Sequence, residues 1–232
     1  MRIQPEIDGA AVVLRGSFNP AIFTPAWFVL HELLPNTAAE TATLQVAHDQ
    51  VTEFSFDWLS LQVTTDTFVA ETVQAPHIRV RDLVLRVFQE HLYHTPLRLI
   101  GINRNVHVPL GPAELDRIGR TLAPVEPWGG YVEEMDLGGP GGGMTTLKMS
   151  QLNPKGRPAG SQINITVGPS NRIGGGRLGV YVQVNDQYAI PKDDPPSGQE
   201  LLRALEDNFE PSLLRSASVV DHVLSLARES YG

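Results

Sequence analysis

The chain has 232 residues, a formal net charge of −8 and a hydrophobic fraction of 41%, which is enough to build the core of one large or two small domains. The absence of cysteine excludes disulfides, thiol nucleophiles, iron–sulfur clusters and zinc sites that use cysteine. No apolar run approaches the ~20 residues that cross a bilayer, and residues 1–9 lack the apolar core of a secretory signal, so we expect a cytoplasmic protein with no membrane contact.

The first predicted elements are a strand and a short helix. Residues 10–16 are mostly apolar and end at a glycine, which is typical of a strand. Thr24 followed by Pro25 is a typical helix start, since the threonine can cap the helix and proline suits its first position. Pro35 is expected to end this helix.

A sheet-forming segment and an amphipathic helix follow. From Val51 to Thr72 residues with high β propensity dominate, and the apolar positions change parity near Trp58, which predicts a bulge or a tight turn there. Residues 79–94 carry apolar side chains at helical spacing and charged residues elsewhere, which predicts a helix that Pro96 ends.

The middle of the chain predicts one more strand and helix before a linker. Residues 97–108 are expected to form a strand interrupted by the polar run 103–105, and Pro112 opens a short helix. The next segment is rich in proline, glycine and acidic residues, which is typical of a linker. We therefore divide the chain into an N-terminal subdomain (1–122), a linker (123–144) and a C-terminal subdomain (145–232).

The C-terminal part predicts two strands and then helices. Residues 162–167 and 178–185 alternate apolar and polar side chains, and the turn-forming residues 168–177 between them predict an antiparallel hairpin with a long tip. Two helices are expected from Ser197 onward, with Pro211 starting the second. The whole pattern predicts an α+β fold, with helices on one face of an antiparallel sheet and a C-terminal helical segment.

One short motif resembles a known family. Gly16-Ser-Phe-Asn-Pro20 resembles the first motif of the nucleotidylyltransferases that adenylylate nicotinate or pantetheine phosphates, in which a His-x-x-His pair follows and binds the nucleotide phosphates. Here residues 21–26 contain no histidine, and the next one is His31. We therefore interpret the motif as a turn that ends the strand and is capped by Asn19 and Pro20.

No metal or cofactor site is predicted. His91 and His94 lie three residues apart on the predicted helix and could offer two metal ligands, but we favour a buried imidazole and a partner for the helix dipole. Gly138–Gly143 and Gly174–Gly176 lead into strands and lack the spacing of phosphate or dinucleotide loops. No serine lies in a Gly-x-Ser-x-Gly context.

Charge is distributed unevenly along the chain. The forty-nine residues from Leu137 to Asn185, here called the acid-free segment, contain no Asp or Glu and twelve of the 21 glycines. Its basic residues, which are our candidate partner- or anion-binding residues, are Lys148, Lys155, Arg157, Arg172 and Arg177. The segment is therefore +5 and the rest of the chain −13, which sums to the −8 of the whole. Such separation of charge favours a specific partner.

These features lead to three functional hypotheses. The leading one is a non-enzymatic interaction or assembly subunit, a homo-oligomer or a member of a larger complex, which contacts protein through the basic hairpin. The alternative is nucleic-acid binding by the same ribbon. An enzyme acting on a small anionic substrate is less favoured; its pocket would use Arg104, His107 or the pair His91 and His94.

Overall fold

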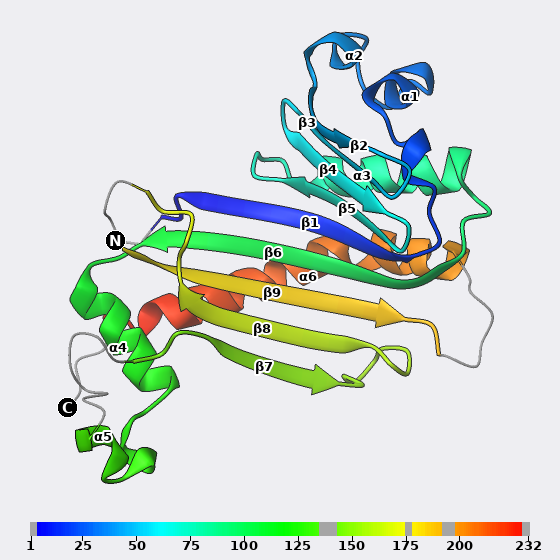
Figure 1. Ribbon diagram of the computed structural model, residues 1–232. Coiled ribbons are helices and arrows are strands. Elements are labelled where there is room, and N and C mark those ends of the chain that lie inside the picture. Colours follow the sequence, from blue (N-terminus) through cyan, green and yellow to red (C-terminus); the bar gives the residue numbers. More distant parts are fainter. Residues whose placement is uncertain (1–3, 135–142, 175–177, 192–197, 229–232) are drawn as a thin grey trace.

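The computed structural model describes residues 4–134, 143–174, 178–191 and 198–228. Its centre is a 9-stranded sheet in the order β2-β3-β4-β5-β1-β6-β9-β8-β7, in which every neighbouring pair is antiparallel (Figure 1). The strands are β1 (Ile7–Gly16), β2 (Thr43–Ala47), β3 (Val51–Phe56), β4 (Leu59–Thr64), β5 (Thr67–Thr72), β6 (Leu97–Pro109), β7 (Leu147–Leu152), β8 (Gln162–Pro169) and β9 (Gly179–Ala189).

Helices cover one face of this sheet. The helices are α1 (Pro25–Leu30), α2 (Ala38–Thr41), α3 (Ile78–Arg86), α4 (Pro112–Leu122), α5 (Tyr131–Glu134) and α6 (Gly198–Ser225), with the short turns η1 (Pro20–Ile22), η2 (Val87–His91) and η3 (Glu126–Trp128). Of these, η3 and α5 bury no residue and project away from the sheet. The long helix α6 packs across β6 and β9, and α3 packs against β1 and β5 (Figure 1). The predicted α+β fold is therefore confirmed, including its C-terminal helix.

Two local predictions from the first half of the chain are confirmed. The Thr24 hydroxyl accepts a hydrogen bond from the Trp27 amide at 3.2 Å and caps α1, with Pro25 in the first turn. The parity change near Trp58 is a tight turn between β3 and β4, in which Asp57 has a φ of +47°. Because this turn is followed by another after Thr64, the segment 51–72 forms three strands.

The polar run 103–105 does not interrupt β6. The strand is continuous because β1 and β9 pair with it on both sides along nearly its whole length. Arg104 points to the helix-covered face, where it binds both carboxylate oxygens of Asp8 at 3.0 and 2.7 Å and the Leu213 carbonyl at 3.2 Å. Arg104 is thus hydrogen-bonded although it lies in the middle of a continuous strand.

The prediction of two C-terminal helices is wrong. Residues 198–225 form a single helix, α6, and Pro211 lies inside it on the exposed side. Proline in a helix removes one backbone hydrogen bond, but buried residues on both sides of it, Phe209 and Ser212, hold the helix against the sheet. The packing of α6 against the sheet therefore outweighs the local tendency of Pro211 to end the helix.

The apolar core forms two neighbouring clusters on the covered face. One lies around β1, β3–β5, α1, α3 and the first half of α6, and the other joins the second half of α6 to α4, β8 and the adjoining parts of β6 and β9. Between them the sheet is continuous, since β6 pairs with β9 from Leu99↔Ala189 to Pro109↔Gly179. The division into 1–122, 123–144 and 145–232 stays a prediction.

Candidate functional site

The sheet face opposite the helices, here called the polar face, carries amide side chains from neighbouring strands. Asn103 on β6 lies opposite Asn185 on β9, which lies opposite Asn164 on β8. One row further along, Asn105 lies opposite Gln183. Because directly opposed residues of antiparallel strands point to the same face, the three strands together present rows of amides.

Hydrogen bonds fix several of these amides. The hydroxyl of Tyr181 and the amide nitrogen of Gln183 both donate to Asn105 Oδ1, at 3.1 and 3.0 Å. On the outer strands, Ser150 Oγ donates to Asn164 Oδ1 at 2.7 Å. Since Asn105 Oδ1 accepts both of these hydrogen bonds, the NH₂ group of Asn105 can donate to another acceptor.

A cavity of about 400 Å³ lies at one end of the polar face, under the chain that follows β8. Its lining residues come from β5, β6, β9, the end of β8 and this overlying chain: Glu71, Asn105, His107, Pro169, Asn171, Arg172, Tyr181 and Gln183. Contacts of the overlying chain with β6 and β5 show that it crosses this end of the sheet (Figure 1).

His107 anchors the overlying chain to the sheet. Its Nδ1 lies 2.8 Å from Ser170 Oγ, and its ring stacks on Tyr181 with 4.7 Å between centroids. Ser170 Oγ also accepts the amides of Arg172 and Ile173 at 3.3 Å each, so its proton is left for His107. Burial, assisted by the positive charge of Arg172, lowers the pKa of His107, which keeps the imidazole neutral at neutral pH.

Arg172 and Glu71, the two charged residues of the cavity, lie close together without a hydrogen bond between them. The Arg172 guanidinium lies 3.9 Å from Glu71 Oε1, which is longer than a hydrogen bond. The Arg172 side chain is about half exposed, at 53%, whereas that of Glu71 is 24% exposed. Burial raises the pKa of Tyr181, so its hydroxyl keeps the proton that it donates to Asn105.

Arg157, another predicted site residue, points into the protein. It forms an ion pair with Asp186 on the covered face, and its guanidinium lies 4.7 Å from the centre of the Tyr188 ring. Asp186 also accepts hydrogen bonds from Ser212 at 2.6 Å and Arg215 at 2.8 Å. With side-chain exposures of 9% for Arg157 and 4% for Asp186, this pair fastens the β7–β8 turn to α6.

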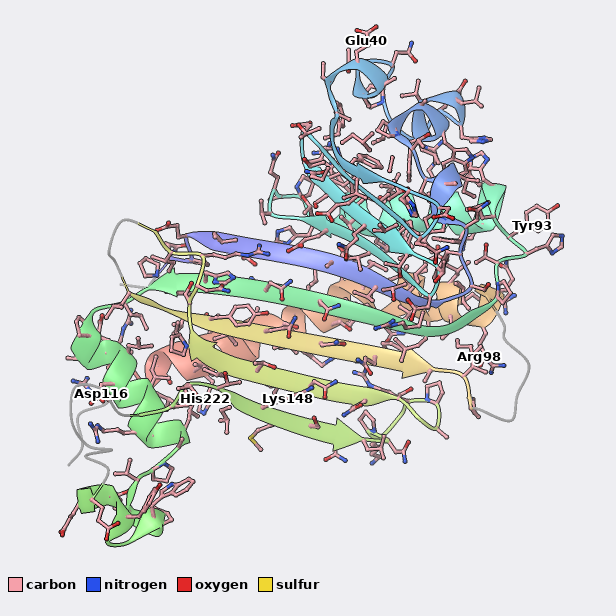
Figure 2. The ribbon with its side chains drawn as sticks, viewed as in Figure 1. Glu40, Tyr93, Arg98, Asp116, Lys148 and His222 are labelled. Atoms are coloured by element: carbon pink, nitrogen blue, oxygen red, sulfur yellow. The ribbon has the colours of Figure 1, made fainter. Side chains whose placement is uncertain are left out.

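The predicted site residues do not form one cluster. Lys148 on β7 and Lys155 in the turn after it are exposed at the outer edge of the sheet, and Figure 2 places Lys148 at this end of the molecule. Arg172 lies over the cavity, and Arg157 lies inside. Arg177 falls outside the described residues.

The residues of the nucleotidylyltransferase-like motif line a different cavity. Asn19 caps η1 by accepting the Ala21 amide at 3.2 Å, which confirms the predicted turn. A side chain at Gly16 would collide with the Pro96 carbonyl oxygen. The cavity beside this turn, about 410 Å³, is also lined by His91 and His94, and the motif supplies no pair of histidines to it.

His107 does not lie with His91 and His94, which line the other cavity. β6 begins at Leu97, close to His94, whereas His107 lies near the other end of this strand. His91 instead lies against His31, with 4.5 Å between ring centroids and the two rings tilted by 49°. Among the described residues, no group of three or more His, Asp or Glu side chains is placed to hold a metal ion.

Comparison with models of known protein families and with curated proteins found no match for this chain. Of the helices in the described parts of the chain, none has the length and apolar character needed to span a membrane.

Proposed function

We propose that the protein is a non-enzymatic assembly subunit that pairs with a second copy of itself along β7. The observation that supports this is the position of β7 at the end of the sheet, where only β8 pairs with it within the described residues. An edge strand presents a row of backbone donors and acceptors that another strand can join. Such strand addition is a common mode of protein recognition.

The β7 edge has few features that would block a partner strand. All six residues pair in register with β8, and the strand contains one lysine, no proline and no acidic residue. Met149 and Leu152 are 63% and 59% exposed. The opposite edge, β2, has a register shift between Leu44 and Val46, and such a bulge protects an edge against pairing.

A projection of opposite charge lies near the start of β7. Residues 126–134, here called the acidic projection, form η3 and α5 and expose Glu126, Glu133 and Glu134. The same projection exposes Trp128 and Tyr131, at 63% and 49%. Aromatic side chains surrounded by charge are typical of protein interfaces, so this surface is suited to a basic partner.

Two-fold symmetry would bring these surfaces together. In Figure 1, β7 begins on the side of α4 and α5 and ends at the turn that contains Lys155, and α5 extends beyond the β7 edge. A two-fold axis through the middle of β7 pairs the strand antiparallel with its copy. The same rotation moves the acidic projection of the second copy toward Lys155 of the first, and opposite charges there favour this orientation.

Nucleic-acid binding through the same segment is the alternative. Of the five candidate basic residues, Arg157 is engaged with Asp186, and the chain carries −8 overall. Non-specific binding to nucleic acid depends on many phosphate contacts, and its affinity falls steeply with salt. A salt-sensitive gel shift at low protein concentration would favour this alternative over self-assembly.

Cysteine cross-linking tests the β7 pairing. The chain has no cysteine, so Met149→Cys and Ser150→Cys each introduce a single thiol on β7. At the residue on the two-fold axis, the two Cβ atoms would lie about 4.5–5.5 Å apart, close to the separation that a disulfide needs. We expect one of the two variants to form a covalent dimer under mild oxidation, seen by non-reducing electrophoresis.

The matched control is Gln45→Cys, which places the thiol on the exposed strand β2 at the other edge. It should remain monomeric under the same oxidation. Cross-linking of all three variants would indicate random collision, and failure of both β7 variants would contradict the proposed pairing.

A further inference from the structure

Small residues of β1 lie between the strands that carry Glu71 and Asn105, two of the residues that line the cavity under Arg172. Gly9 lies opposite Asn105 on β6, and Ala11 lies opposite Glu71 on β5. A Cβ atom at Gly9 would lie 3.1 Å from the Thr72 carbonyl oxygen and 3.7 Å from Glu71 Oε1. Glycine at this position therefore leaves space beside the Glu71 carboxylate.

The charges around this space are balanced. Arg172 and Glu71 supply one positive and one negative group, 3.9 Å apart, and the remaining lining residues are neutral at neutral pH. A ligand with a single charge would be attracted by one of these groups and repelled by the other. A ligand that carries both charges can bind both groups, and it gains charge-assisted hydrogen bonds that the long Arg172–Glu71 contact does not provide.

Further in, the cavity offers neutral donors and acceptors. Tyr181 and Gln183 hold Asn105 by its oxygen, at 3.1 and 3.0 Å. This arrangement leaves the NH₂ group of Asn105 as a donor and the oxygen of Gln183 as an acceptor. Their side chains are only partly buried, so both groups can be reached by a polar ligand.

We propose that this cavity binds a small zwitterion, a free α-amino acid with a polar side chain. Its carboxylate binds Arg172, its ammonium group binds Glu71, and its side chain meets the amides of Asn105 and Gln183. The volume of about 400 Å³ lies within the ~300–1,000 Å³ typical of small-molecule sites. The site is separate from the β7 edge, so it does not depend on the proposed assembly.

Calorimetric titration with each of the twenty common L-amino acids tests this proposal. We expect at least one with a polar side chain to bind with a dissociation constant below about 10 mM. For that amino acid, Arg172→Gln and Glu71→Gln should each weaken binding at least about tenfold. Both substitutions remove one charge at a partly exposed position, and Glu71→Gln also preserves side-chain shape.

The controls separate this site from general charge effects and from assembly. Arg15→Gln removes a similarly exposed arginine that pairs with Asp66 at 3.0 Å outside the cavity, and it should leave binding unchanged. The double variant Met149→Lys, Leu152→Lys changes the β7 edge and should also bind normally. The proposal is wrong if none of the twenty amino acids binds, or if Glu71→Gln leaves affinity the same or raises it, as a simple anion site would.

Discussion

At the scale of single residues, the environment decides what each basic residue does. Arg157 and Arg172 are fifteen positions apart in the same acid-free segment, yet the side chain of Arg157 is 9% exposed beside Asp186, and that of Arg172 is 53% exposed above a cavity. Sequence composition could show that the segment is basic. It could not show that Arg157 is buried in an ion pair, because its partner Asp186 lies on β9, twenty-nine residues further along the chain.

The buried ion pair predicts a large effect on stability. Asp186→Asn leaves the Arg157 guanidinium inside the protein without its carboxylate, and removing one partner of a buried pair typically costs about 3–5 kcal/mol. We expect a loss of this size in the free energy of unfolding, measured with urea. Asp116→Asn, which removes an exposed pair within α4, should cost only about 0.3–0.5 kcal/mol. Equal effects would contradict the structural role of Asp186.

His107 predicts a dependence of stability on pH. Its pKa in the folded protein lies below the ordinary value of 6.5, so below that pH the unfolded chain takes up a proton that the folded chain resists. The free energy of unfolding should therefore fall as the pH drops from about 6.5 toward the lowered pKa. Above pH 6.5 the contribution of His107 to the free energy of unfolding should be constant.

Urea unfolding at a series of pH values measures this contribution as a difference between variants. His107→Gln should flatten the fall in stability below pH 6.5 relative to the unsubstituted protein. The exposed His222, labelled in Figure 2, provides the control for removal of a histidine as such, and His107→Gln should flatten the slope more than His222→Gln does. If His107→Gln has the same slope as the unsubstituted protein, burial does not disfavour its charged form.

At the scale of elements, the sequence predicted correctly those features that depend on residues close together along the chain. Thr24 and Pro25 predicted the start of α1, and the alternation in 162–167 and 178–185 predicted β8 and β9. The alternation also showed which side chains share a face. It could not show that Asn103, Asn185 and Asn164 form one row, because strand order and register depend on contacts between distant parts of the chain.

The cavity likewise depends on strand order and register, which local sequence signals do not reveal. Glu71, Asn105 and Gln183 come from three strands and carry no motif, so no sequence signal pointed to them as a group. The sequence suggests His107 as a pocket residue only alongside Arg104 and the pair His91 and His94, and these side chains lie elsewhere in the structure. Register across four strands, rather than residue type, creates this site.

Helix α6 gives a prediction at the element scale. Pro211 lies within the continuous helix and is exposed, and proline is about 3 kcal/mol less favourable than alanine inside a helix. Pro211→Ala should therefore raise the free energy of unfolding, by up to about that amount, in a urea titration. An unchanged or lowered free energy of unfolding would contradict this prediction and show that proline is as favourable as alanine at this position.

At the scale of the whole molecule, the charges that are separated along the sequence stay apart in space only in part, because Arg157 and Arg172 lie beside carboxylates. The acidic projection lies near the start of β7, and Lys155 lies past its end (Figure 1). The acid-free segment thus contributes the edge strand β7, an inward-pointing arginine and the chain that overlies the cavity. The proposed dimer would extend the sheet through β7 and leave the polar face of each copy accessible.

The most direct test of this assembly is the molecular mass in solution, measured by sedimentation equilibrium. We expect the unsubstituted protein to be a dimer at tens of micromolar, and Met149→Lys with Leu152→Lys to be a monomer, since lysines on an edge strand oppose pairing. The matched variant Leu44→Lys with Val46→Lys, on the exposed β2 edge, should remain dimeric. A monomeric unsubstituted protein, or a dimer that survives the two lysines on β7, would contradict the proposed assembly.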